Sequence, residues 1–126
     1  MKYTLEQLEG MSDDGLNKVV ATLEGFGMDN GYGFIDSNGN VVCYDIICPR
    51  DEEPYCTEVR KNYCNNWADM GPMIHKEKII LIFDPLTKLW FATTVFNSWL
   101  NEEPRFNANP LRAAAIAYIL AKQEGY

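Results

Sequence analysis

Tyr63, Asn65, Asn66 and Trp67 lie in one short segment that offers the most varied side-chain chemistry in the chain. Each asparagine amide can donate and accept hydrogen bonds, and both aromatic rings can stack on a flat ligand. Arg112, far away in the sequence, could contact a phosphate or a carboxylate. Capping a helix uses only one asparagine side chain, so the other needs a different partner. We therefore expect a ligand or partner site at this segment, facing Arg112.

Four cysteines, Cys43, Cys48, Cys56 and Cys64, follow the spacing C-x4-C-x7-C-x7-C. Four thiolates could complete a tetrahedral zinc site. Structural zinc sites often use a C-x2-C knuckle, which this chain lacks, and the one histidine, His75, lies well beyond Cys64. Free thiols, buried or incidental, are therefore the favoured interpretation. No cofactor is expected, and zinc is the alternative.

The chain is acidic, with eleven Lys and Arg residues against eighteen Asp and Glu residues and a net charge of −7. Nonspecific phosphate binding relies on clustered cations, so nucleic acid is not an expected partner. Lys2 is followed by a polar stretch without the apolar core of a signal peptide. The longest apolar runs, residues 79–83 and 113–121, are far shorter than a membrane span. The sequence predicts a soluble cytoplasmic protein that has no membrane partner.

Motifs of the common enzyme classes are missing. The sequence has no P-loop, no G-x-G-x-x-G phosphate cradle and no G-x-S-x-G nucleophile elbow. A Cys–His nucleophile pair would have to use His75, and nothing near His75 in the sequence supports that role. Enzymatic activity is left open, and a non-enzymatic role is favoured.

Patterns in the first half of the chain predict a helix, a hairpin and a loop. Ser12 can cap a helix that ends at Gly25, and apolar residues recur between them at helical spacing. Residues 32–35 and 41–46 read as strands joined by an Asn-Gly turn. Residues 47–62 carry two prolines and a run of charges, so they predict an exposed, irregular loop with a short extended piece at its end.

Residues 63–95 hold the richest group of aromatic side chains and are expected to form the centre of the core. Either asparagine of the pair can cap a short helix, which Gly71-Pro72 is expected to interrupt. Residues 79–83 are apolar without alternation, which predicts a central strand buried on both faces. Residues 89–95 are rich in aromatic and β-branched side chains and read as the return strand.

The last helix begins at Asn109 and Pro110, a good cap followed by the favoured first helical residue, and it ends at Gly125. Arg112 lies near the positive end of this helix dipole, where a cation is slightly unfavourable. That mismatch predicts a specific carboxylate or ligand as the partner of Arg112.

The order of elements is therefore helix, hairpin, loop, helix, hairpin, helix, in a single domain over residues 1–126. The predicted fold class is α+β. We expect a four-stranded, mainly antiparallel sheet, built from the two hairpins and packed with three helices.

Several segments resemble motifs of one family. Tyr63-Cys64-Asn65-Asn66, with Asp69, Pro72 and Ile74, resembles the motif Y-C-N-N-P-x-D-A-W-P-I-I. Asn109-Pro110-Leu111-Arg112-Ala113-Ala114, with Ile116, resembles N-P-L-R-A-A-M-I, and the segment after Ser12-Asp13 resembles the opening helix of the same proteins. On these motifs the chain resembles the NinX-like family of small phage proteins.

The resemblance implies an α-β-α sandwich and a phage-encoded accessory protein that acts in the cytoplasm of a bacterial host. It brings no established enzymatic activity. Trp67 stands where the motif has proline, and Gly71 stands where it has tryptophan. A pocket built on that tryptophan would need another aromatic residue, for which Trp67 and Trp90 are the candidates. Asp69, which matches the motif, joins the candidate site.

Small size, acidity, missing catalytic motifs and the phage resemblance favour a non-enzymatic protein that binds and inhibits a host protein, such as an antiviral defence protein. The alternative is a small-molecule binder that sequesters a nucleotide-like signal through Tyr63, Asn65, Asn66, Trp67 and Arg112. A structural zinc module is a third hypothesis. Self-association is left open.

Overall fold

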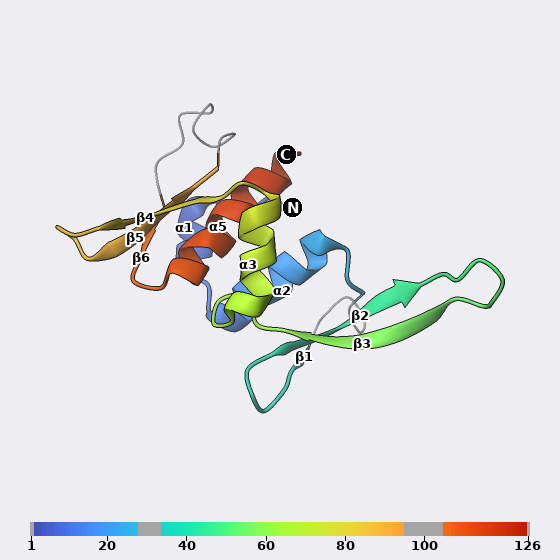
Figure 1. Cartoon of the computed structure of the whole chain (residues 1–126). Coiled ribbons are helices and arrows are strands. Elements are labelled where there is room, and N and C mark those ends of the chain that lie inside the picture. The colour runs from blue at the N-terminus through green and yellow to red at the C-terminus, as the bar shows by residue number, and fades with distance from the viewer. Residues whose placement is uncertain (1, 28–33, 95–104, 126) are drawn as a thin grey trace.

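The computed structural model describes residues 2–27, 34–94 and 105–125. Over these ranges the chain forms four helices and six strands (Figure 1). The helices are α1 (Leu5–Glu9), α2 (Asp13–Glu24), α3 (Trp67–Lys76) and α5 (Pro110–Gln123). The strands are β1 (Phe34–Ile35), β2 (Val41–Ile47), β3 (Tyr55–Lys61), β4 (Ile80–Asp84), β5 (Leu89–Thr93) and β6 (Arg105–Asn107). The predicted α+β class is confirmed.

The helices start where their capping residues predict. The side chains of Ser12, Asn66 and Asn109 each accept a hydrogen bond from a backbone N–H in the first turn of α2, α3 and α5. Gly25 ends α2 with a left-handed φ of 95°. The interruption predicted at Pro72 is wrong, because α3 continues through it. The proline deprives one carbonyl in the previous turn of its donor, and that turn is exposed, so water can replace the lost hydrogen bond.

Helix α5 is the centre of the fold. Ten of its side chains are buried, and it contacts α1, α2, α3, β5 and β6. Its alanines let these neighbours approach closely. The expectation that residues 63–95 form the centre of the core is therefore wrong, and Trp67 is in fact 56% exposed. No helix in the described part of the chain, α5 with its 14 residues included, is long and apolar enough to cross a membrane.

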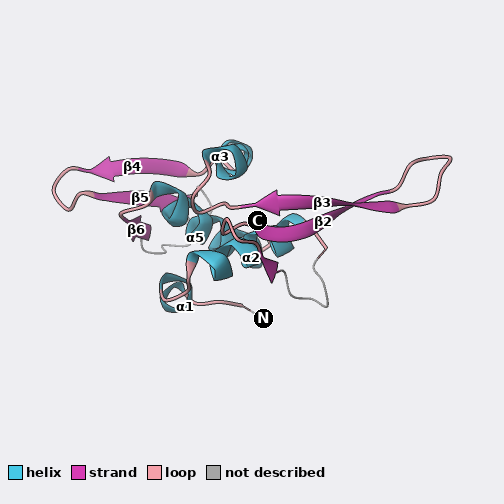
Figure 2. Cartoon of the chain, turned by 90° about the horizontal axis from the view of Figure 1, so that it is seen from below, coloured by secondary structure: helices cyan, strands magenta, loops and turns pink. Residues whose placement is uncertain are grey.

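The strands form two separate antiparallel sheets, each of three strands, with the orders β1-β2-β3 and β4-β5-β6. The single four-stranded sheet and the count of three helices are therefore wrong. Strand β3 lies within the predicted loop of residues 47–62 and pairs with β2 over seven residue pairs. The helices lie between the two sheets, which extend in opposite directions (Figures 1 and 2). This arrangement differs from a sandwich of one sheet between helices.

Strand β4 is an edge strand, so the prediction of a central strand buried on both faces is wrong. Strand β5 holds the central position. Ile80, Ile82 and Phe83 are 41%, 54% and 44% exposed, whereas Leu81 packs against the core. The helical core covers only one face of this hairpin, and only near its base. An unbroken apolar run therefore does not establish burial on both faces.

Parts of two predicted strands lie outside the described residues. Of the strand predicted over residues 32–35, the structure describes residues 34 and 35, which form β1. Of the strand predicted over residues 89–95, residue 95 lies outside the described ranges, and β5 ends at Thr93.

Candidate functional site

Asp13, in the first turn of α2, joins two of the predicted site residues. Its Oδ1 atom lies 2.7 Å from Nη1 of Arg112, and its Oδ2 atom accepts a hydrogen bond of 3.3 Å from Nδ2 of Asn65. Arg112 also donates to the backbone carbonyls of Glu9, at 3.1 Å, and Met11. The carboxylate predicted for Arg112 is therefore present within the chain, and it offsets the mismatch with the α5 dipole. Arg112 thus ties the start of α5 to the α1–α2 connection.

Asn17 is the buried centre of the same network. It is fully buried on α2, where its Nδ2 donates to Oδ1 of Asn62 at 2.9 Å and its Oδ1 accepts from the backbone N of Cys64 at 2.9 Å. Asn109 holds the other side of this peptide segment, because its Nδ2 donates to the carbonyl of Cys64 at 2.7 Å. Sequence reasoning missed Asn17 and Asn62. The available signal was a single amide within the apolar face of α2.

Asn66 and Asp69 fix the entry to α3. The Asn66 side chain caps the helix by accepting from the backbone N of Ala68 at 2.9 Å. Asp69 Oδ2 accepts from the backbone N of Asn62 at 2.8 Å, and its Oδ1 lies 3.8 Å from Nζ of Lys61. Asn66 thus fixes where α3 begins, and Asp69 holds the end of β3 against the first turn of α3.

Tyr63 and Cys64 are fully buried below this network. The Tyr63 hydroxyl donates to the carboxylate of Glu24 at the end of α2. Burial, together with the hydrogen bond to Glu24, raises the pKa of Tyr63 above its ordinary value. Burial likewise raises the pKa of the Cys64 thiol to about 12. The Tyr63 ring is therefore part of the core and presents no free face for stacking.

Trp67 is the predicted aromatic residue that a partner could reach directly. It begins α3, is 56% exposed, and shares a helix face with Gly71, which lies one turn later. No atom lies within 4 Å of the position a Cβ would take at Gly71, apart from its own helix and chain neighbours, so the surface beside Trp67 is open.

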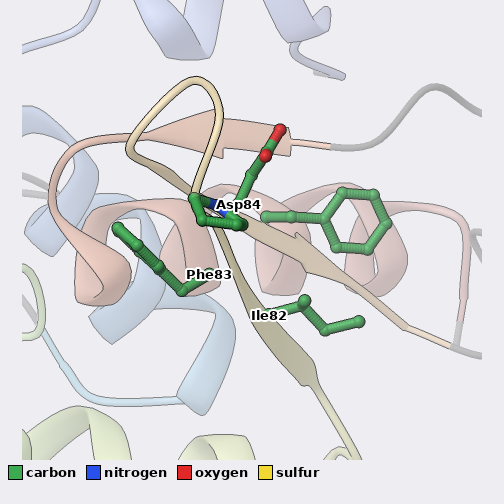
Figure 3. A pocket seen from close by; sticks show the side chains of 5 residues that line it. Ile82, Phe83 and Asp84 are labelled. Carbon is green, nitrogen blue, oxygen red and sulfur yellow. The ribbon is translucent and has the colours of Figure 1, made fainter.

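Trp90 belongs to a different part of the molecule. It lies on β5, half-buried, and its ring meets that of Phe83 edge to face with a centroid distance of 5.3 Å. Beside this pair is a hollow of about 340 Å³, lined by Ile82, Phe83, Asp84, Pro85 and Phe91 (Figure 3). The side chains of Ile82 and Phe83 leave β4 in opposite directions, as alternation along a strand requires (Figure 3). The β4–β5 hairpin is therefore apolar on both faces.

The outer half of the β2–β3 hairpin, residues 45–58, forms a second exposed surface that we call the arm. It extends away from the helices (Figures 1 and 2). Ile46 is 61% exposed and Tyr55 is 50% exposed. The arm also carries five acidic residues and one arginine. Sequence reasoning ended the strand at Ile46, treated residues 47–62 as an exposed loop with a short extended piece at its end, and did not expect that piece to pair with β2.

The cysteines divide between the core and the arm. Cys43 and Cys64 are buried, and Cys48 and Cys56 are exposed, all four as free thiols. Within residues 2–27, 34–94 and 105–125, no three His, Cys, Asp or Glu residues gather closely enough to hold a metal ion. The zinc site over Cys43, Cys48, Cys56 and Cys64 stays an untested prediction.

One comparison with known proteins identifies the relatives of this chain. The family model described as bacteriophage P22, NinX matches residues 8–122. Curated proteins and solved structures give no significant match. The matched range includes the α2 cap at Ser12, the segment from Tyr63 to Ile74 and the Asn109–Arg112 segment that together build the polar network. The chain therefore belongs to the NinX family of bacteriophage P22, as its motifs predict.

Proposed function

We propose that this NinX-family protein is a phage-encoded accessory protein that binds a host protein through its arm and blocks that protein, without catalysing a reaction. Family membership supports the phage origin. The observation that carries the binding role is the arm itself, which holds exposed apolar side chains away from the rest of the fold.

The arm is expected to be only marginally stable in water by itself. A two-stranded ribbon without a covered face is marginally stable. Ile46 is 61% exposed and Tyr55 is 50% exposed, although burial would stabilise both side chains. The β2–β3 register places them on opposite faces of the ribbon, so a groove of a partner protein that encloses the ribbon would cover both. Aromatic and aliphatic side chains of this kind are frequent anchors at protein interfaces.

The charge of the arm indicates what kind of groove would fit. Residues 45–58 contain Asp45, Asp51, Glu52, Glu53 and Glu58 against Arg50 alone. Glu58 is paired with Arg60 at 2.6 Å, and none of the other four carboxylates forms an ion pair with a described residue. An acidic arm complements a cationic groove. Proteins that act on nucleic acid have such grooves, so a host defence protein of that class is the proposed target.

Small-molecule binding at the predicted site residues has less support. The Tyr63 ring is buried, and Nδ2 of Asn65, Oδ1 of Asn66 and both terminal nitrogens of Arg112 already make hydrogen bonds within the chain. Only Trp67 is left to offer an open stacking surface. A nucleotide would have to displace the polar network to use the donors of Asn65 and Arg112, which favours the protein partner as the proposal.

The test is capture of host proteins on immobilised wild-type chain and on matched variants. Glu52→Gln/Glu53→Gln and Ile46→Ser should each weaken capture by about tenfold, since they remove charge complementarity and an apolar anchor. Glu6→Gln/Glu9→Gln on α1 and Leu23→Ser on α2 are controls of equal chemistry on exposed sites away from the arm, and should not change capture.

Inhibition is measured on the captured protein itself. Its activity should fall as wild-type chain is added, and the Glu52→Gln/Glu53→Gln variant should need about tenfold more protein for the same effect. Capture that the arm variants and the control variants reduce equally would contradict the proposal. So would a captured protein whose activity is unchanged at saturating wild-type chain. A thermal shift with a nucleotide panel would instead support the small-molecule alternative.

A further inference from the structure

Strand β4 presents an unguarded sheet edge at the end of the molecule opposite the arm. No described strand pairs with its outer side. Natural edge strands are commonly protected by lysine, proline, a bulge or an inward-pointing charge. Along Ile80–Asp84 the only charge is Asp84, at the last position, and the two exposed isoleucines face the same side. This edge is a template for another strand.

We infer that β4 pairs with β4 of a second copy of this chain, antiparallel about a two-fold axis at Leu81. This pairing is independent of the proposed partner of the arm. It would join two three-stranded sheets into one continuous sheet of six strands. A two-fold axis brings the same patch of both copies into contact, so the apolar edge of each copy is covered by the same edge of the other.

The register follows from the side chains along the strand. With the axis at Leu81, Ile80 of one copy lies opposite Ile82 of the other, and this contact occurs twice. Strand β4 begins at Ile80, and Lys78 lies before it in a turn with a φ of 56°, so the cross-strand contacts within β4 are those of Ile80, Leu81 and Ile82.

Asp84 decides between this register and the next one along the strand. Its Oδ1 accepts from the backbone N of Leu86 at 2.9 Å, and this hydrogen bond contributes most to keeping the pKa of Asp84 below its ordinary value. The carboxylate is therefore ionised at neutral pH. An axis at Ile82 would instead place Asp84 opposite Ile80 of the other copy, which sets a charge against an apolar side chain. The axis at Leu81 avoids this conflict.

The faces of the two sheets also match. Leu81 faces the helical core, and Ile80, Ile82 and Phe91 lie on the opposite face by strand alternation and register. A two-fold axis perpendicular to the sheet keeps like faces together, so these residues of both copies would form one apolar strip. The hollow beside Ile82 and Asp84 would then adjoin Ile80 of the other copy.

Short strands limit how strong this contact can be. With the axis at Leu81, pairing within β4 covers three residues on each side, Ile80, Leu81 and Ile82, and interfaces below about 1,200 Å² are commonly weak. We expect dissociation in the micromolar range. Sedimentation velocity of the wild-type chain from about 1 to 300 μM should therefore show its mass rising from 14.4 kDa toward twice that value.

Two complementary variants test the register. Ile82→Glu and Ile80→Lys should each shift the dissociation constant by more than tenfold, because each places a charge in both cross-strand contacts. An equimolar mixture of the two should dimerise again, since one contact becomes Glu opposite Lys and the other returns to Ile opposite Ile. Both positions are exposed in the single chain, so each variant should keep its fold, as circular dichroism can verify.

Leu23→Glu, at a 38% exposed position on α2, is the matched control and should dimerise as the wild type does. A wild-type chain that stays monomeric up to about 300 μM would overturn the inference. Equal dimerisation of Ile82→Glu and wild type would also overturn it. A mixture that stays monomeric would overturn the Leu81 register and with it the pairing.

Discussion

The two sheets have the same number of strands and the same antiparallel pairing, yet their outer ends expose different side chains to water. Sheet β1-β2-β3 ends in an arm dominated by acidic side chains, whereas sheet β4-β5-β6 ends in a hairpin that is apolar along its edge. Each sheet is covered by helices only at its base, where Val41 and Ala92 are fully buried. Packing against the helices therefore constrains the side chains only at the base of each sheet, and the outer ends can differ in charge and polarity.

Among variants that affect the two sheets differently, Asn17→Leu should have the largest effect on stability, because it removes the buried centre of the polar network. The substitution leaves the N–H of Cys64 without its acceptor and removes one of the two donors to Oδ1 of Asn62, so we expect a loss of about 2–4 kcal/mol in the free energy of unfolding. Urea denaturation measures this loss. Asn62 follows β3 directly, so hydrogen exchange should speed up in β3 more than in β4.

Asn65→Ala is the control for that prediction, because Asn65 is exposed and bonds to the same network from outside. It should cost no more than about 1 kcal/mol. Equal losses from both variants would show that the network has no buried centre. Equal exchange in β3 and β4 would show that the two sheets share one base.

A smaller effect should separate the base of β2 from the arm. Val41→Ala removes buried methyl groups and should cost about 1–3 kcal/mol in the free energy of unfolding. Ile46→Ala, five residues along the same strand at a 61% exposed position, should change it by less than about 0.5 kcal/mol. Thermal or urea unfolding distinguishes the two. A large loss at Ile46 would mean that the arm is packed in solution.

Alkaline pH should weaken the base and leave the arm unaffected. Because burial raises the pKa of Tyr63, the folded tyrosine keeps its proton after the unfolded one has lost it. The unfolded state then binds fewer protons, so the stabilisation is complete below pH 10.0 and falls above it, at about 1.4 kcal/mol per pH unit. Tyr63→Phe should flatten this fall in urea titrations between pH 9 and 11. Tyr55→Phe in the arm should leave the slope as it is.

Thiol labelling at pH 8 should show the smallest effect, and it compares the exposed arm with the buried base. Cys48 and Cys56, exposed in the arm, should react within minutes, and Cys43 and Cys64 should react only after unfolding. Burial raises the pKa of both protected thiols, to about 12 for Cys64, so little thiolate forms there. Mass spectrometry should count two labels on the native chain and four in denaturant. Four labels without denaturant would contradict the buried base.

Local signals in the sequence predicted the helix starts well. Ser12, Asn66 and Asn109 cap the helices because a cap depends on residues two or three positions away. The carboxylate partner of Arg112 was also predictable, since a cation near the positive end of a helix needs compensation. Which carboxylate it would be was not, because Asp13 lies 99 residues away in sequence.

Features that depend on distant neighbours were missed. Strand β3 carries side chains that are mostly exposed, and it is held by its pairing with β2, which its own composition does not encode. Strand β4 has the composition of a buried strand but lies at an edge, because burial depends on what packs beyond it. The amide of Asn17 meets Asn62 only once α2 and the end of β3 are placed side by side.

The opposite directions of the arm and of β4 have a consequence for how many targets one assembly could engage. If two copies join at β4, their arms point outward from the far ends of an elongated particle (Figure 2). Two arms so placed could not grip one small target together. They would instead bridge two target molecules, and avidity would arise only on targets that are themselves paired or arrayed at a matching spacing.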